Sequence, residues 1–169
     1  MSSLKTSAVE MVQSIKKGAI TSEELVKSYI EQIKKKEKDV EAWEFFDPEL
    51  AIAQAKKSDE LHQSGKHGDL HGIPVGIKDI FDTEDMPTTD GTEIHKKNPS
   101  WNDCTVVSKL KQAGAIIMGK TVTTELYNSH TQRAISVPAT RAIDDGNCPF
   151  LCVIGKQTLL LAFTDDADK

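Results

Sequence analysis

The chain has 169 residues, of which 38% are hydrophobic and 28% are charged, a composition typical of one soluble globular domain with its own core. Its formal net charge of −5 argues against general nucleic-acid binding, because contacts to phosphates need a net basic face. No apolar run approaches the ~20 residues of a membrane span, and the N-terminus lacks the apolar segment of a secretory signal. We therefore expect a cytoplasmic protein with no nucleic-acid partner and no membrane partner.

The N-terminal forty residues predict two amphipathic helices that pack as a hairpin on a sheet. Residues 7–17 carry apolar side chains at helical spacing, and Gly18 ends this first helix. Thr21 and Glu24 have the spacing of a capping box, which predicts the start of a second helix over residues 22–38.

A short strand and a third helix are expected next. Residues 40–46 include three aromatic side chains and predict the strand. Asp47 is placed to cap the following helix, and Pro48 suits its first position. Ser64 and Gly65 are typical of the end of that helix.

The stretch over residues 70–79 (LHGIPVGIKD) predicts a short buried strand over 74–78 that ends in a lysine. Gly76, between two β-branched residues, indicates a strand whose backbone is closely approached by another group. Lys78 at the end of such a strand would be partly desolvated, and desolvation makes a lysine usable as a base. The alternative is a structural lysine that pairs with Asp79 or extends to the surface.

A loop, a helix and a second strand follow. Residues 80–92 are rich in turn formers and hydroxyls, which predicts an ordered loop. Asp103 is expected to be the N-cap of a helix over 103–113, which Gly114 ends. The continuous apolar run over 115–119 is typical of a buried parallel strand.

The lysine-ending strand, this helix and the apolar strand together predict a βαβ unit and an α/β fold. Ligands of open α/β sheets bind at the C-terminal ends of the strands, which is where Lys78 is expected to lie.

Cysteines and histidines do not indicate a metal site. The three cysteines are an odd and sparse set without zinc-ribbon spacing: Cys104, Cys148 and Cys152. His62, His67 and His71 are close in sequence, but their spacing matches no known metal-binding motif, so we interpret them as surface and turn residues. We expect no metal and no cofactor.

Three stretches resemble motifs of the amidase signature family, in the family's order and spacing. They are residues 70–79 (LHGIPVGIKD), 87–92 (PTTDGT) and 114–126 (GAIIMGKTVTTEL). With the N-terminal helices, the resemblance covers roughly residues 5–128. It divides the chain into the N-terminal part of an amidase signature domain, 1–128, and a divergent tail, 129–169. The fold class it implies is an incomplete α/β domain, with N-terminal helices before a partial mixed or parallel sheet flanked by helices.

The activity that the resemblance implies is hydrolysis of amide carbon–nitrogen bonds by a Ser–cis-Ser–Lys triad. The lysine that matches Lys78 is the family's general base, which acts through a bridging serine on a second, nucleophilic serine. Both family serines lie in Gly/Ser-rich stretches that have no counterpart here. After Lys120 the only serines are Ser129 and Ser136, and neither has a glycine neighbour. Ser129 precedes His130, but adjacency in a loop is too little to assign a Ser–His pair, so Lys78 is the one catalytic residue carried over.

Two explanations fit the missing serines. The chain is a truncated or frameshifted amidase, or it is a short homologue that kept the N-terminal half and lost hydrolysis; the abrupt loss of similarity after residue 128 favours the first. We expect an amidase-type hydrolase of small-molecule amides that is inactive as given. The alternatives are a non-catalytic binding module, a relative of the glutamyl-tRNA amidotransferase A subunit, and an unrelated α/β binding domain. The incomplete sheet would expose an apolar face, which predicts self-association.

Overall fold

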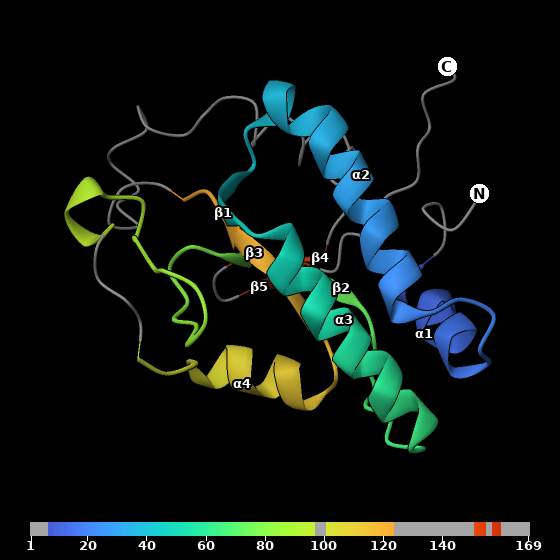
Figure 1. Ribbon diagram of the computed structural model, residues 1–169. Coiled ribbons are helices and arrows are strands. Elements are labelled where there is room, and N and C mark those ends of the chain that lie inside the picture. Colours follow the sequence, from blue (N-terminus) through green and yellow to red (C-terminus); the bar gives the residue numbers. More distant parts are fainter. Residues whose placement is uncertain (1–6, 97–100, 124–150, 155–156, 160–169) are drawn as a thin grey trace.

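The computed structural model describes residues 7–96 and 101–123, and the backbone of 151–154 and 157–159 (Figure 1). These residues form an α/β fold in which helices surround one mixed sheet. The helices are α1 (Ala8–Lys16), α2 (Ser22–Val40), α3 (Pro48–Gln63), the short 3-10 helix η2 (Glu93–His95) and α4 (Thr105–Gln112). The strands are β1 (Trp43–Phe46), β2 (Pro74–Lys78), β3 (Ile116–Thr121), β4 (Leu151–Ile154) and β5 (Gln157–Leu159).

The sheet has the order β1-β3-β2-β4-β5, so that β2 lies at its centre. β2 runs parallel to β3 and to β4, whereas β1 and β5 are antiparallel to their neighbours. The chain connects β2 to β3 through the segment that contains α4. The predicted βαβ unit and the predicted mixed sheet are therefore confirmed.

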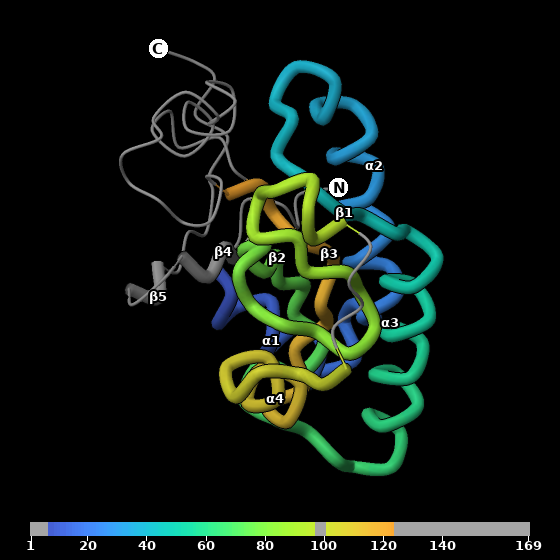
Figure 2. The backbone as a smooth tube through the Cα atoms, turned by 90° about the vertical axis from the view of Figure 1, so that its left-hand side faces the viewer, coloured from blue at the N-terminus to red at the C-terminus, as the bar shows by residue number. Residues whose placement is uncertain are grey.

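Two helices form a layer on one side of the sheet. α3 contacts β3, and α2 packs against α3, an arrangement that Figure 2 shows from the side. The apolar stripe of α2 is buried in this layer and consists of Leu25, Val26, Tyr29, Ile30 and Ile33. β2 and β3 are apolar on both faces, as expected of central strands that are covered on both sides.

The predicted caps of α2 and α3 are confirmed. Thr21 Oγ1 accepts a hydrogen bond from the Glu24 amide at 3.0 Å, and the Glu24 carboxylate accepts one from the Thr21 amide at 2.9 Å. Asp47 Oδ1 accepts from the amide of Leu50, in the first turn of α3, at 3.1 Å. Each such cap stabilises its helix by about 1 kcal/mol.

The predicted N-cap of α4 is wrong. Cys104 occupies that position without a side-chain hydrogen bond, one residue after the expected Asp103. The Asp103 carboxylate instead accepts from the Glu84 amide at 2.9 Å and from Lys111 Nζ at 2.9 Å. The Asp103 carboxylate thus accepts hydrogen bonds from a loop amide and from a lysine of α4 and does not cap the helix.

The predicted close approach to Gly76 is confirmed, and the approaching group is the Trp43 ring. Gly76 pairs with Gly119 across β2 and β3, and the Trp43 ring lies against both glycines. A Cβ atom on Gly76 would lie 3.2 Å from Trp43 Cη2 and 3.2 Å from Thr121 Cγ2. On Gly119 it would overlap the Phe45 carbonyl oxygen and lie 2.9 Å from Trp43 Cε3. The two glycines make room for the tryptophan and for β1.

A glutamine of α3 completes the hydrogen bonds of β3. β1 pairs with β3 only from Gly119 to Thr121, which leaves Ile117 without a neighbour from β1. Gln54 Nε2 donates to the Ile117 carbonyl at 3.0 Å, and the Ile117 amide donates to Gln54 Oε1 at 3.0 Å. The side-chain amide takes the place of a neighbouring strand and joins α3 to the sheet.

Replacing Gln54 by leucine should lower the free energy of unfolding by about 1–3 kcal/mol, because it leaves the Ile117 amide and carbonyl without partners in a buried place. Urea unfolding followed by circular dichroism measures the effect. The matched control is Gln63→Leu at the exposed last residue of α3, which we expect to change stability by less than about 0.5 kcal/mol. Equal effects of the two substitutions would contradict a role for Gln54 in joining α3 to β3.

No helix in the part of the chain that the structure describes is long and apolar enough to cross a bilayer.

Candidate active site

Lys78 is the last residue of β2 and is half-buried at the C-terminal edge of the parallel strands. Its partner on β3 is Thr121, the last residue of that strand. The Lys78 carbonyl accepts from the amides of Ile80 at 2.8 Å and Phe81 at 3.0 Å, so the chain turns out of the sheet directly after the lysine. Lys78 thus lies at the predicted end of the predicted strand.

The next residue belongs to a fully buried ion pair. Asp79 Oδ1 lies 3.3 Å from Lys120 Nζ, and both side chains are 0% exposed. Lys120 Nζ also donates to the Pro87 carbonyl at 3.0 Å and to Thr88 Oγ1 at 2.6 Å. A buried ammonium needs such oxygens to replace the water it has lost. Three protein oxygens therefore surround the Lys120 ammonium.

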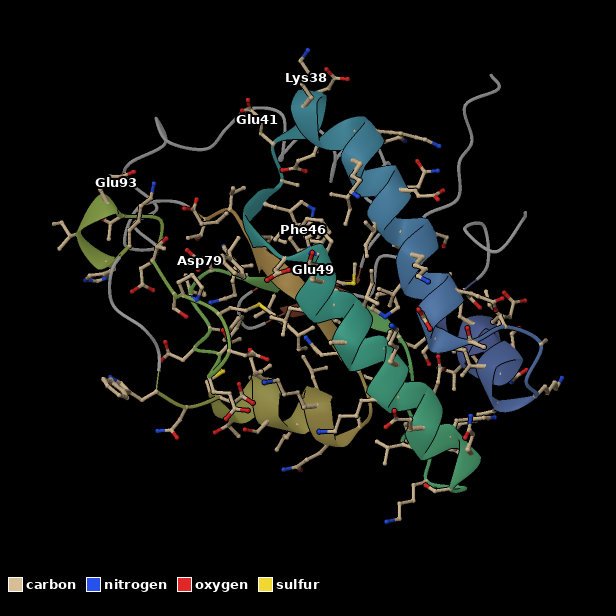
Figure 3. All side chains as sticks on the ribbon, viewed as in Figure 1. Lys38, Glu41, Phe46, Glu49, Asp79 and Glu93 are labelled. Carbon is tan, nitrogen blue, oxygen red and sulfur yellow. The ribbon has the colours of Figure 1, made fainter. Side chains whose placement is uncertain are left out.

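Asp79 holds the loop that follows Lys78. Its carboxylate accepts from the Thr89 amide at 3.1 Å and from the Thr89 hydroxyl. The Asp79 amide donates to the Thr121 carbonyl at 2.9 Å, and its carbonyl accepts from the Asp90 amide at 3.0 Å. Figure 3 shows Asp79 where the chain leaves the sheet and enters this loop. The loop over residues 80–92 is therefore ordered by Asp79 and Lys120 together, as its composition predicted.

The two lysines of this region have different surroundings. Burial lowers the pKa of Lys120 from its ordinary value and outweighs the opposing attraction of Asp79. Because its amine is enclosed, Lys120 has no surface to offer a substrate, whereas Lys78 is partly exposed. Lys120 is thus suited to position the loop beside Lys78.

The ion pair was missed by sequence reasoning, which treated Lys120 only as part of a motif. One feature of the sequence could have indicated the pair. Lys120 lies near the end of an apolar strand, and Asp79 directly follows the strand that was expected to pair with it in parallel. Ser129, His130 and Ser136 lie outside the described residues.

The interpretation of the three histidines as surface and turn residues is confirmed for His71 only in part: this residue lies in a turn, but it is buried, with 2% of it exposed. One ring nitrogen each of His62, His67 and His71 lies within 4.8 Å of the others. His71 Nε2 lies 3.4 Å from the Ser58 hydroxyl on α3. Burial, followed by the neighbouring His67 and His62, lowers the pKa of His71 from its ordinary value. The turn before β2 thus folds His71 inward beneath α3.

The family model described as Amidase matches residues 24–145, most of the chain. The chain belongs to the amidase family. The predicted family and fold class are confirmed. The amidase match extends past residue 128, where the resemblance was expected to end, so the division of the chain at 128 stays a prediction.

Relatives of this amidase chain are known among proteins and solved structures. AmiD of Mycobacterium tuberculosis (strain ATCC 25618 / H37Rv), named as an amidase, is 35% identical over 122 residues, which are 72% of this chain and 26% of AmiD. The glutamyl-tRNA(Gln) amidotransferase A subunit of Lachnospira eligens is 38% identical over 142 residues, 83% of this chain and 30% of that protein. The native peptide amidase from Stenotrophomonas maltophilia has a TM-score of 0.67 and 26% identity, and the match covers 72% of this chain and 25% of that one.

The chain thus spans about a quarter to a third of the length of the relatives that it matches.

Proposed function

We propose that this chain forms part of an amide hydrolase in which Lys78 is the general base, and that its 169 residues alone do not hydrolyse amides. The amidase match over residues 24–145 carries the proposal. The position of Lys78 at the end of a buried parallel strand supports it, because ligands of α/β sheets bind at that edge.

The proposed chemistry needs three groups, of which this chain offers one. A neutral lysine would take a proton from a bridging serine, which in turn would activate the serine that attacks the amide carbonyl. Neither serine after Lys120 has the Gly/Ser-rich surroundings of the family. Without a nucleophile placed within hydrogen-bond reach of the base, a small amide would not react.

Ammonia release from simple carboxamides such as acetamide and benzamide tests the first part of the proposal. We expect the purified protein to release no more ammonia than buffer, and Lys78→Ala to change nothing. Turnover that Lys78→Ala abolishes would overturn the proposed inactivity. Calorimetric binding of a carboxamide without ammonia release would favour the alternative of a binding module.

A chimaera tests the role of Lys78 itself. Residues 1–128 would replace the corresponding part of the Stenotrophomonas maltophilia peptide amidase. If that chimaera is active, Lys78→Ala should lower kcat by at least about 10²-fold, the usual contribution of a general base. Lys78→Arg should not restore it, because arginine stays protonated. The control is Lys109→Ala, at an exposed position on α4, and an equal loss there would contradict the assignment.

A second candidate function is that of a glutamyl-tRNA(Gln) amidotransferase A subunit, which the 38% identity over 142 residues favours. Co-expression with the remaining subunits of the Lachnospira eligens enzyme tests it. Co-purification as a stable complex would support this function, and separate elution would exclude it without affecting the amidase proposal.

The proposed partner is a small-molecule amide, and the proposed location is the cytoplasm, which cell fractionation tests. Self-association is proposed as well, because β1 and β5 are the outer strands of the described sheet, and outer strands can pair with another chain. Light scattering of the purified protein measures it.

A further inference from the structure

Three imidazole rings from one short stretch of the chain meet beside the end of α3. His62 lies in the last turn of α3, His67 in the following loop, and His71 in the turn before β2. The ring centroids are 4.6 Å apart for His62 and His67, 5.1 Å for His67 and His71, and 5.8 Å for His62 and His71. In Figure 1 this is the region at the lower right, where the chain leaves α3 and turns back toward the sheet.

One atom of the cluster has an unmet hydrogen-bonding requirement. His62 Nδ1 is buried and has no hydrogen-bond partner among the described residues. Buried polar atoms are nearly always paired, so an orphan of this kind calls for a missing water, ion or ligand. The His62 ring is also one of three neighbouring imidazoles, each of which offers a nitrogen within 4.8 Å of a nitrogen of the other two.

We propose that His62, His67 and His71 bind one divalent transition-metal ion of the zinc class. Imidazole nitrogens suit Zn²⁺, Cu²⁺ and Ni²⁺, and three histidines with an open fourth position are a known zinc ligand set. The C-terminal end of a helix also favours a cation, because the aligned peptide dipoles place partial negative charge there.

The three histidine nitrogens need to move only a short distance to reach the spacing of zinc ligands. Zn–N bonds of about 2.0–2.1 Å at the tetrahedral angle place ligand nitrogens about 3.3 Å apart. The nitrogens are at most 4.8 Å apart in this structure, so they must approach by up to about 1.5 Å. His67 is exposed on its loop and can make this movement, whereas His71 is buried and oriented by Ser58. Hydrogen bonds of that kind commonly fix the ring of a metal-binding histidine.

The metal would join the end of α3 to the segment that leads into β2. His71 lies before the first residue of β2, and Lys78 is the last residue of that strand. The metal site and the candidate active site are therefore at opposite ends of β2. The proposed role of the metal is to stabilise the fold. This role does not depend on the proposed amidase function.

Zinc binding to the whole chain, freed of metal with EDTA, tests the proposal by calorimetry. We expect one Zn²⁺ per chain and a melting temperature that rises on its addition. His67→Gln should weaken binding at least about tenfold, and His71→Gln should do the same. Because His67 is exposed, His67→Gln should leave the circular dichroism spectrum and the metal-free melting temperature unchanged.

Two controls test whether side chains outside the cluster bind the zinc instead. His95→Gln removes a histidine outside the cluster, which lies 3.0 Å from Asp90 and should not affect binding. Serine at Cys104, Cys148 and Cys152 removes all thiols and should also leave zinc binding intact. The absorption spectrum of the Co²⁺-loaded protein should show tetrahedral bands without a thiolate charge-transfer band.

Three results would each overturn the proposal. They are wild-type zinc affinity in His67→Gln, loss of binding in the cysteine variant, and absence of binding by the wild-type chain at micromolar zinc.

Discussion

Replacing Lys120 by methionine should lower the free energy of unfolding by about 3–5 kcal/mol, because it leaves the buried Asp79 carboxylate without its cation. Methionine fills a similar volume, so little of the loss would come from a cavity. The loss is a large part of the 5–15 kcal/mol that typically separates folded from unfolded domains. Urea unfolding measures it, with Lys109→Met on the exposed face of α4 as the control that should stay within about 0.5 kcal/mol.

A double variant distinguishes loss of the pair from loss of packing. Asp79→Asn removes the negative charge but keeps an oxygen that can accept from Thr89. If the pair carries the effect, Lys120→Met combined with Asp79→Asn should be destabilised by less than the sum of the two single variants. Strict additivity would mean that the two groups act independently.

The pH dependence of stability gives a second measurement of Lys120. Burial sets its pKa in the folded protein below its ordinary value of 10.5. Between these two values the unfolded chain binds a proton that the folded chain does not, so the free energy of unfolding contributed by this group rises with pH. The rise is complete above the ordinary pKa. Lys120→Met should remove this part of the alkaline pH dependence.

Alanine at Gly119 should destabilise the protein by about 3 kcal/mol or more, near or above the usual upper end for an overpacked core. The new methyl group would overlap the Phe45 carbonyl oxygen, which belongs to the backbone of β1 and cannot move alone. Alanine at the paired Gly76 should cost only about 1 kcal/mol, because its neighbours at 3.2 Å are side-chain atoms of Trp43 and Thr121. Thermal unfolding of the two variants measures the difference.

A smaller residue at position 43 shows which neighbour makes alanine unfavourable at each of the two glycines. Trp43→Leu should relieve part of the cost of Gly76→Ala, because the ring is one of the two groups that the methyl meets. It should not relieve Gly119→Ala, because the carbonyl of Phe45 stays in place. A double-mutant cycle gives these coupling energies. Equal rescue of both alanine variants would mean that the ring alone sets the need for glycine.

Much of the fold was predictable because neighbouring residues encode it. Thr21 and Glu24 need only their spacing of three residues to cap α2. The prediction of Asp103 as the N-cap of α4 failed because its carboxylate accepts a hydrogen bond from the Glu84 amide, nineteen residues away in the chain. A short-range pattern cannot reveal a competitor at that distance.

The candidate site was predictable in one part only. Lys78 could be located because the end of a single strand defines its position. Asp79 and Lys120 meet because β2 and β3 pair in parallel. The sequence of one strand alone does not determine its register with its neighbour, so this contact could not be predicted. The same holds for His71, whose burial depends on the packing of α3 over the turn before β2.

The strand order has a consequence for how the chain folds during synthesis. β2 is the central strand, and its second parallel neighbour, β4, begins only at Leu151. Until that residue has left the ribosome, β2 has a free edge, although its apolar residues Val75 and Ile77 are fully buried in the folded protein. The contact that closes this edge joins segments far apart in the chain, a kind of contact that forms slowly. The strand that ends in Lys78 thus depends, for a complete set of neighbours, on residues made long after it.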